Sequence, residues 1–483
     1  MAFPDQSFVE FLSVGERSSC GYCKNQRGVP RREEEGGDGI AKSAQEGAAE
    51  AGHVQLATSV STGGAYAHQL LVEDYAGLLD LGWRRSGRYL YKPDNENTCC
   101  PQYTIRLDVT QFKLSRTQKR VMRQMNEFLA TGKRPRCGVK EENPVEDQIE
   151  EKSPSKKEES KEPAAKKAKD AQRDVLKKKE IRNQKFEEKC RRQKKDPDAV
   201  RAELREKEAA RRRTIRSYID EARPDWLHKL EIQVVRPNTP ACNERELESF
   251  ELYTKYQEAI HNDTARFAGF RRFLCDSPLN VTKRNGVDFG AFHMWFLLDN
   301  KLIAVCVIDV LPKFLSAKYM YYDTDYSFLS LGTYTALREI EFTQSLHALS
   351  PAIQHYYMGF YIHSCPKMRY KAKFHPSDLL CDRTHKWLDF ESCREILDAS
   401  TKDNGYATFC PESPPGTPLD IDDMRVMTTG LQGVPIVTTF RRACVIHPEA
   451  IENEELLNKV RTAANLIDAS LFGMIFYFAE LNN

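Results

Sequence analysis

The sequence predicts a protein of the α+β class, in which a mixed β-sheet with two splayed strands is joined to a small cysteine-rich N-terminal domain. Three observations support this prediction. Residues 292–362 follow the order hairpin, strand, helix and returning strand; four cysteines form a C-x-x-C loop and an adjacent pair; and a highly charged stretch separates two regions with clear apolar patterning. The 483 residues suffice for two to four domains at roughly 100 to 200 residues each.

Composition divides the chain into four stretches. One stretch is rich in Gly, Ala and Glu without apolar periodicity, which is typical of disorder, and another is too charged to bury a core. The expected stretches are a cysteine-rich domain at 1–30 and 65–136, a disordered insertion at 31–64, a basic linker and arm at 137–216, and the domain with the splayed sheet at 217–483.

Charge is distributed unevenly along the chain. Residues 151–216 carry 25 Lys+Arg and 14 Asp+Glu, a net of +11, whereas the remainder carries 47 against 56, a net of −9, for a total of +2. A basic segment on a slightly acidic body indicates a polyanionic partner.

The sequence favours a protein of the cytoplasm and nucleus without a membrane segment. Residues 1–10 hold two acids and no base, unlike a secretory or transit signal, and the longest apolar run, 471–479, is about half of what a bilayer crossing needs. Because cytosolic thiols stay reduced, the 14 cysteines indicate metal binding or catalysis rather than a disulfide framework. We expect a monomer or a weak oligomer.

Local signals predict the elements of the first region. A short helix is expected over Val72–Leu81, ended by Gly82, and a strand over Tyr89–Tyr91. Ser115 and Gln118 have the spacing of a capping box, so a second helix is expected from there to Gly132. Basic residues recur on one face of this helix at i, i+3, i+4 and i+7, and they are Arg116, Lys119, Arg120 and Arg123.

The second region carries the pattern that predicts the splayed sheet. Two β-rich runs, Phe292–Leu298 and Lys301–Leu311, flank the two-residue turn Asp299-Asn300 and predict a hairpin. The elements expected after it are a strand at Lys318–Tyr322, a helix from Ser330 to about Leu346, and a parallel return strand at Tyr356–Ile362. This order is that of the acetyltransferase (GNAT) core, in which two strands splay to leave a cleft.

The C-x-x-C loop and the adjacent cysteine pair predict a metal site. Cys20, Cys23, Cys99 and Cys100 offer four thiolates, which suit either zinc or an iron-sulfur cluster. The alternatives are ordinary buried thiols or a disulfide between the adjacent pair. Among the other cysteines, only Cys365, close to His363, is a candidate nucleophile.

Two further stretches of the second region suit an anionic ligand. The helix start at Ser330, with Gly332 permitting close approach to the backbone, fits a phosphate or carboxylate, and the alternative is a simple helix cap. Residues 356–371 combine aromatic side chains with cations, which suits a nucleotide or an RNA end, and the alternative is a hydrophobic strand with a solvated tip. For the basic stripe formed by Arg116, Lys119, Arg120 and Arg123, the alternative is a helix face that is exposed to solvent and binds nothing.

At these motifs the chain resembles one family, the arginyl-tRNA protein transferases. The resemblance spans most of residues 8–381 apart from the insertion and the arm. It is carried by Cys20-Gly-Tyr-Cys-Lys-Asn, Gly82-Trp-Arg-Arg-Ser-Gly, Cys99-Cys-Pro-Gln-Tyr-Thr-Ile-Arg106, Ile308-Asp-Val-Leu-Pro, Asp325-Tyr-Ser-Phe-Leu-Ser-Leu-Gly332, residues 356–371 and Pro376-Ser-Asp-Leu-Leu-Cys381. No clear match continues beyond about residue 405, where a strand at Val434–Phe440 and a helix at Glu452–Phe478 are expected.

The resemblance implies an enzyme that moves arginine from arginyl-tRNA to the N-terminal α-amino group of proteins beginning with Asp, Glu or oxidised Cys. The product would be an N-degron for ubiquitin-dependent degradation. The resemblance further implies a GNAT-like catalytic part and a [4Fe-4S] cluster, with zinc as the competing assignment, on the four cysteines.

The chemistry of such a transfer suggests site residues. An aminoacyl ester is already activated, so the enzyme must position a neutral amine, accept a proton and stabilise an oxyanion. We expect Asp309 or Asp323 to help to take the proton and Tyr361 to offer its hydroxyl to the leaving 3′-oxygen.

Cations are expected to bind the two anionic substrates. Lys367 and Lys371, with Arg338 or His363 as alternates, are the candidates for the acidic N-terminal side chain. Charged tRNA is expected to bind through phosphates to the basic arm, to the helix stripe and to the helix start at Ser330 and Gly332.

Two functions from other classes compete with this interpretation. A GNAT-type N-acetyltransferase would share the fold, but it normally needs a glycine-rich pyrophosphate loop, which is absent at Ser330. A non-catalytic RNA-binding adaptor with a structural zinc module would explain the arm and the cysteines, but it would not explain an acidic loop and an aromatic strand converging on one cleft.

Overall fold

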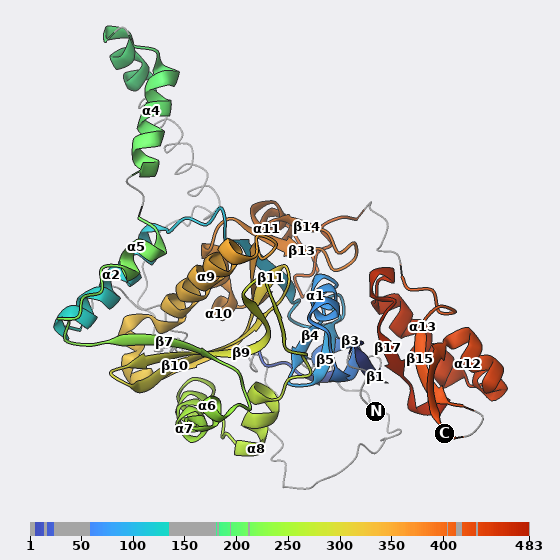
Figure 1. Ribbon diagram of the computed structural model, residues 1–483. Helices are drawn as coiled ribbons and strands as arrows, with labels where there is room; N and C mark the ends of the chain where they lie inside the picture. Colours follow the sequence, from blue (N-terminus) through green and yellow to red (C-terminus); the bar gives the residue numbers. More distant parts are fainter. Residues whose placement is uncertain are drawn as a thin grey trace, which may run out of the picture. The chain divides into compact units, whose positions relative to one another are not determined.

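A computed structural model describes residues 5–13, 17–23, 58–134, 180, 183–193, 195–210, 213–402, 404–411, 418–430 and 433–482 (Figure 1). The chain divides into two compact units, one formed by residues 1–137 with 219–483 and the other by residues 138–218. No helix in the described ranges is both long enough and apolar enough to cross a membrane.

The first unit is built around two mixed sheets. In the larger sheet the strand order is β14-β13-β6-β12-β11-β10-β9-β7, with β8 paired to β9. Its strands are β6 (Tyr103–Asp108), β7 (Leu230–Val235), β8 (Thr282–Arg284), β9 (Val287–Leu298), β10 (Lys301–Val310), β11 (Phe314–Tyr322), β12 (His355–Tyr361), β13 (Ser377–Leu380) and β14 (Trp387–Asp389). Among the described strands of this sheet, β11 and β12 form the one parallel pair.

The hairpin predicted in the second region is present. Leu298 pairs with Lys301, and the two residues between them, Asp299 and Asn300, adopt left-handed φ values of 49° and 68°. Such a turn matches the right-handed twist of its strands, so the chain reverses within two residues. Nearly every residue of β9 and β10 is buried, which explains their almost continuous apolar sequence.

The parallel strands β11 and β12 pair only over a short stretch. They pair at three successive positions, the last of which joins Ser316 to Tyr357, and over the rest of these two fully described strands no further pair between them is formed. β12 then bulges against β6 between Tyr357 and Phe360, where Gly359 has a φ of 71°. Pairing between β11 and β12 thus ends after three positions, at a point that we call the splay, and the bulge redirects the end of β12 that leads to Tyr361.

The smaller sheet has the order β16-β15-β17-β1-β3-β5-β4, with β2 paired to β3. Its strands are β1 (Phe8–Ser13), β2 (Arg17–Ser19), β3 (Thr58–Gln69), β4 (Arg84–Ser86), β5 (Tyr89–Pro93), β15 (Arg425–Thr429), β16 (Pro435–Thr439) and β17 (Ile475–Tyr477). Each sheet thus combines strands from before residue 137 and after residue 216. Residues 137–216 were expected to separate two domains, but both sheets contain strands from both sides of this segment.

Two expectations need correction. Residues 58–64, assigned to the disordered insertion, belong to β3, where Val60 and Thr62 supply β-branched residues at alternate positions. The helix expected at Glu452–Phe478 ends at Leu466, and the apolar run after it supplies β17 instead. The remainder of the insertion, residues 31–57, lies outside the described ranges.

The predicted helices of the first unit form at the expected places. Ser115 and Gln118 make the reciprocal capping box of α2, and Gly132 ends that helix with a φ of 68°. The α-helices are α1 (Val72–Asp80), α2 (Arg116–Thr131), α6 (Pro240–Asn243), α7 (Glu246–Tyr256), α8 (Phe267–Phe270), α9 (Leu331–Leu349), α10 (Pro366–Arg369), α11 (Phe390–Asp398), α12 (Phe440–Ile446) and α13 (Glu454–Leu466). Shorter π and 3₁₀ turns include η2 (Arg271–Cys275), η3 (Thr324–Leu329) and η4 (Tyr370–Lys373).

The second unit corresponds to the basic arm. Its described part is helical at residues 183–192 and in α4 (Pro197–Ala210), and α5 (Ile215–Ile219) begins within it. Arg201 pairs with Glu187 and Asp198 on its surface. The linker expected at residues 137–179 lies outside the described ranges.

Candidate functional site

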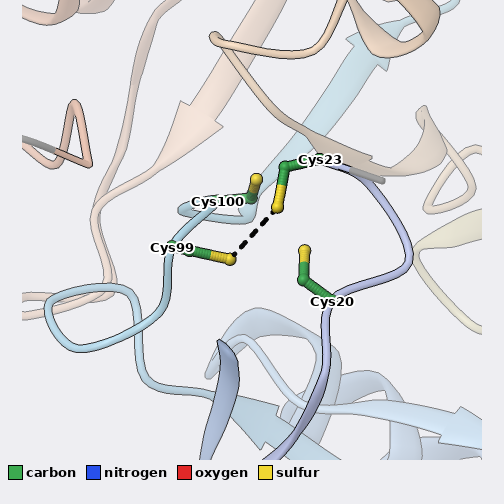
Figure 2. A group of neighbouring side chains, drawn as sticks. All are labelled: Cys20, Cys23, Cys99 and Cys100. Atoms are coloured by element: carbon green, nitrogen blue, oxygen red, sulfur yellow. Dashed lines mark hydrogen bonds between the residues drawn. The ribbon is translucent and has the colours of Figure 1, made fainter. Parts of the chain in front are cut away.

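Four cysteine sulfurs converge in the first unit (Figure 2). Cys20 and Cys23 follow β2, while Cys99 and Cys100 lie in the loop between β5 and β6. All four sulfurs lie within 4.8 Å of one another, and the sulfurs of Cys23 and Cys99 are 3.6 Å apart. All four thiols are free, so the alternative of a disulfide between the adjacent pair is not realised.

The electrostatics of this four-cysteine site suit a soft cation. The hydrogen bond from Cys100 lowers the pKa of Cys20 to about 4, which outweighs the opposing effect of burial. Burial raises the pKa of Cys99 to about 12, and the hydrogen bond to Cys20 together with burial raises the pKa of Cys100. Without a metal, four thiols this close cannot all be ionised, because neighbouring thiolates repel one another. A set of four thiolates fits zinc or an iron-sulfur cluster.

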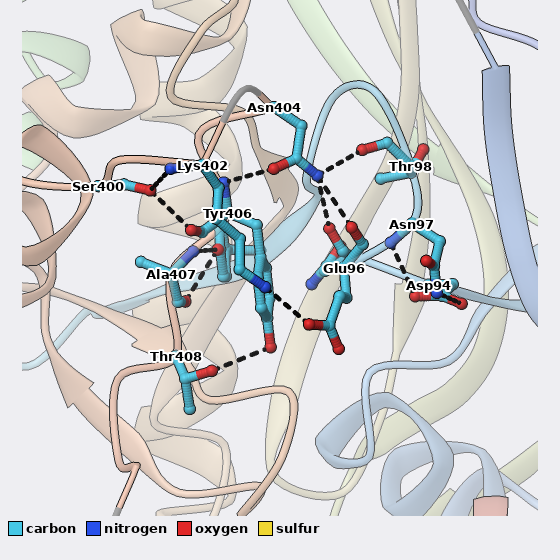
Figure 3. A network of polar contacts seen from close by, with 12 residues as sticks. Asp94, Glu96, Asn97, Thr98, Ser400, Lys402, Asn404, Tyr406, Ala407 and Thr408 are labelled. Atoms are coloured by element: carbon cyan, nitrogen blue, oxygen red, sulfur yellow. Dashed lines mark hydrogen bonds and ion pairs between the residues drawn. The ribbon is translucent and has the colours of Figure 1, made fainter.

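A polar network holds the loop that carries Cys99 and Cys100 (Figure 3). The side-chain amide of Asn404 donates hydrogen bonds to the carbonyl oxygens of Thr98 at 2.8 Å and Glu96 at 3.1 Å. At the other end of the loop, the Tyr103 hydroxyl bonds both the N–H and the carbonyl of Ala407. Outer contacts of this kind fix the geometry of metal ligands.

The four-cysteine site also touches the chain that follows β12. Cys100 forms a small buried cluster with Ile362 and Cys365, against which Cys23 and Met368 pack. The four-cysteine site and the end of β12 are therefore parts of one packed region.

A hydrogen-bonded chain of three side chains lies at this end of β12. The Tyr361 hydroxyl is 2.9 Å from Nδ1 of His363, and Nε2 of His363 is 3.0 Å from a carboxylate oxygen of Asp398 at the end of α11. Tyr361 is buried, its ring packs edge-on against Phe390, and burial raises its pKa. Both ring nitrogens of His363 are thus engaged, so His363 does not serve as the base that a nucleophilic Cys365 would need.

Two buried cations meet near the splay without a carboxylate partner among the described residues. The Lys371 ammonium donates a 2.5 Å hydrogen bond to the Phe360 carbonyl, and burial, with Arg84 acting in the same direction, lowers its pKa to about 7. The Arg84 guanidinium lies over the Phe360 ring at 5.0 Å and donates to the Trp83 carbonyl, but its Nε and Nη2 find no acceptor. Burial lowers the pKa of Arg84 as well.

Neither aspartate expected to accept a proton is placed for that role. Both carboxylate oxygens of Asp309, which is fully buried, bond Arg85, at 2.5 and 2.9 Å. Asp323 bonds the ammonium groups of Lys255 and Lys301, which lower its pKa although burial opposes them. These geometries fit structural ion pairs, because each carboxylate already bonds one or two cationic side chains.

The other candidate cations, Lys367 and Arg338, lie on different helices, and Lys318, for which the sequence suggested no role, lies on β11. Lys367 is exposed on α10, unlike the buried Lys371. Arg338, on α9, donates to the Tyr334 hydroxyl at 3.0 Å, and its Nε has no partner. Lys318, on β11, has a buried ammonium without a partner, and burial lowers its pKa to about 7.

The residues proposed to contact phosphates lie on two helices that pack together. Arg116, Arg120 and Arg123 are exposed on α2, and Lys119 is partly exposed. α2 packs against α9, whose start at Ser330 has a left-handed φ of 51° and no side-chain cap. The helix-cap alternative at Ser330 is therefore not realised by its hydroxyl.

Sequence reasoning missed several residues that the structure brings into the region. Arg84 and Arg85 belong to the family motif Gly82-Trp-Arg-Arg-Ser-Gly, which could have indicated that these two arginines have a role. Asp398 and Asn404 lie in a stretch with no distinguishing spacing, and only the fold reveals their contacts.

Comparisons with known proteins agree with these features. Two family models match the chain, that for the N terminus of arginine-tRNA-protein transferase at residues 18–120 and that for its C terminus at residues 248–381. The chain is 36% identical over 371 residues to arginyl-tRNA–protein transferase 1 of Drosophila melanogaster, covering 67% of this chain and 77% of that protein. It is 30% identical over 471 residues to arginyl-tRNA–protein transferase 2 of Arabidopsis thaliana, covering 75% and 77%.

A shorter similarity reaches a bacterial protein. The chain is 34% identical over 154 residues to the aspartate/glutamate leucyltransferase of Pseudomonas fluorescens, covering 32% of this chain and 59% of that protein.

The Asn404 contacts predict a specific defect at the four-cysteine site. Asn404→Ala removes the hydrogen bonds to the cysteine loop, so we expect chelator to strip metal roughly 10- to 100-fold faster than from the wild type. The measurement is elemental analysis of zinc and iron after anaerobic purification and timed chelation. Lys402→Ala is the matched control, because Lys402 contacts the same loop only through an exposed ion pair with Glu96. Wild-type retention of metal by folded Asn404→Ala protein would contradict the role of this residue.

Proposed function

This chain belongs to the arginine-tRNA-protein transferase family, and from that premise we propose that it arginylates proteins whose N-terminal residue is Asp, Glu or oxidised Cys. As a family member it is a transferase, and arginyl-tRNA is its donor substrate. This membership decides against the N-acetyltransferase and adaptor alternatives. The proposed product is an N-degron that leads to ubiquitin-dependent degradation.

The observation that carries the acceptor class is the pair of buried cations at the splay. Arg84 leaves two nitrogens unbonded and Lys371 bonds only one carbonyl, so both retain capacity for an anion. The side chains of Asp, Glu and oxidised Cys each provide an anionic group. A charge-assisted hydrogen bond contributes roughly 1.5 to 3 kcal/mol, and more where water is excluded. The name of the Pseudomonas relative, an aspartate/glutamate leucyltransferase, supports the same acceptor class.

The separation of β11 and β12 supports a GNAT-like acyltransferase arrangement. A wedge between two parallel strands can admit an acceptor amine and a donor ester side by side. The ester is already activated, so no covalent intermediate with the protein is required. Tyr361, at the end of β12, is the proposed donor of a hydrogen bond to the leaving 3′-oxygen, while Asp309 and Asp323 are left to structural ion pairing.

The proposed cofactor is a [4Fe-4S] cluster held by Cys20, Cys23, Cys99 and Cys100, with zinc as the alternative. Either group would join the loop after β2 to the loop before β6 through metal–thiolate bonds. Because this region packs on Ile362 and Cys365, the cysteines would also support the end of β12.

The proposed tRNA contacts lie on α2 and the start of α9 in the first unit and, separately, on the basic arm. Exposed arginines on α2 suit phosphates, and the first turn of α9, which has no side-chain cap, offers backbone N–H groups near Gly332. Contacts of this type give affinity that depends steeply on salt.

The acceptor assignment predicts a defect confined to the peptide substrate. We expect Lys371→Met and Arg84→Gln each to raise the KM for peptides that begin with Asp or Glu by about 10- to 100-fold, because each removes one charge-assisted contact. The measurement is radiolabelled arginine transfer from charged tRNA onto peptides that differ only in their first residue, with tRNA affinity determined in parallel.

Two further variants complete this test. Lys367→Ala tests whether the exposed Lys367, rather than the buried Lys371, binds the acidic side chain of the peptide. Lys386→Ala is the control, because Lys386 is an exposed lysine without an assigned role. Equal losses of peptide and tRNA affinity in Lys371→Met, or equal wild-type transfer to peptides beginning with Asp and with Ala, would contradict the assignment.

The helix stripe predicts a change in the salt dependence of tRNA binding. Replacing Arg116, Arg120 and Arg123 by Gln should lower the slope of log affinity against log salt by up to about 0.7 to 0.9 for each phosphate that the protein no longer neutralises. The corresponding Lys replacements keep the charge and should preserve the slope. The measurement is a titration of charged tRNA between about 50 and 200 mM salt, and an unchanged slope in the Gln variant would exclude the stripe from the interface.

A further inference from the structure

We propose that Tyr361, His363 and Asp398 form a proton relay for the transfer reaction, in which Asp398 is the positioning residue that fixes the histidine. This inference rests on the proposed function and deepens it. It assigns a role to α11, which carries Asp398 and for which the sequence suggested none.

The geometry of the chain sets the direction of its hydrogen bonds. An ionised carboxylate only accepts hydrogen bonds, so the 3.0 Å contact with Asp398 requires a proton on Nε2 of a neutral His363. Nδ1 is then the unprotonated nitrogen, and it accepts from the Tyr361 hydroxyl at 2.9 Å. Asp398 therefore selects the tautomer in which His363 can take the phenolic proton.

Burial falls steadily along this chain. Tyr361 is 2% exposed, the His363 side chain 22% and the Asp398 side chain 61%. The relay thus connects a hydroxyl in the packed interior with a carboxylate at the surface. Tyr361 also directly follows Phe360, whose carbonyl accepts from Lys371 and whose ring lies under Arg84. The end of β12 therefore carries both the relay tyrosine and the residue that contacts the two proposed acceptor cations.

The reaction requires the net transfer of one proton, and the relay can carry it. The acceptor nitrogen forms a bond to the ester carbonyl carbon, the bond from that carbon to the 3′-oxygen breaks, and one proton must pass from nitrogen to oxygen. Nδ1 of His363 takes the phenolic proton while the phenolate oxygen takes the amine proton. Tyr361 then delivers a proton to the 3′-oxygen, and the imidazolium returns its proton to Tyr361, so both side chains end as they began.

Other charged groups act on the relay from the neighbouring elements. Arg369 on α10, whose side chain bonds the His363 carbonyl, and Arg394 on α11 favour an ionised Tyr361, whereas Asp398 and Glu391 on α11 oppose it. These four charges therefore influence how readily Tyr361 gives up its proton.

The test is single-turnover arginine transfer with saturating tRNA and peptide. We expect Asp398→Asn to lower the transfer rate about tenfold and Tyr361→Phe about 100-fold, with peptide KM and tRNA affinity within twofold of the wild type. The double variant should be no slower than Tyr361→Phe, because both changes interrupt one chain. Asp398→Glu should restore part of the rate, and Glu395→Gln, an exposed residue of the same helix, should leave it unchanged.

Specific outcomes would overturn the relay. A wild-type rate in Asp398→Asn would do so. A loss of melting temperature that fully accounts for the loss of rate would also do so, because it would show that Asp398 only ties α11 to β12. The assay uses whichever acceptor peptide the wild type prefers. Failure of the acidic acceptor class would instead appear in the wild type, as equal transfer to peptides beginning with Asp and Ala.

Discussion

The buried ion pair between Arg85 and Asp309 is the contact on which the arrangement of the site depends. It joins β4 of the smaller sheet to β10 of the larger sheet through two hydrogen bonds, and the two side chains are 1% and 0% exposed. Loss of either partner would leave an uncompensated buried charge, which typically costs about 3 to 5 kcal/mol. Because Arg85 is fixed in this way, its neighbour Arg84 is held over Phe360. The same pairing explains why Asp309 is better suited to joining the sheets than to accepting a proton.

Buried cations without anionic partners destabilise a free protein, and their retention near the splay is therefore informative. Arg84 and Lys371 are desolvated, and burial lowers the pKa of each because it disfavours the charged form. Under the proposed function, an arriving carboxylate would supply the missing partner, so binding energy would be available for an acidic acceptor and absent for a neutral one. Discrimination would then come mainly from the unpaired charges of Arg84 and Lys371, as expected where a buried polar group selects for its complement.

The sequence predicted correctly those parts of the fold that depend on interactions between residues close together in the chain. The capping box at Ser115, the turn at Asp299-Asn300 and the order of elements from β9 to β12 are confirmed, because neighbouring residues fix each of them. Pairing between distant segments was not visible in the pattern. Asp309 lies 224 residues from Arg85, and Asn404 lies 306 residues from Thr98, so their types alone revealed neither contact. The convergence of the four cysteines was expected only because C-x-x-C spacing and an adjacent pair are uncommon enough to suggest one site.

Proton uptake on peptide binding tests the central claim most directly. Lys371 has a pKa lowered to about 7, so at a pH of about 8 it is largely neutral, and a bound carboxylate should raise that pKa and draw a proton from solution. Calorimetric titration in buffers of different ionisation enthalpy should show that a peptide beginning with Asp takes up close to one proton more than the same peptide beginning with Ala. The difference should vanish in Lys371→Met. Equal proton uptake by the two peptides, with wild-type affinity for the Asp peptide in the variant, would contradict the account.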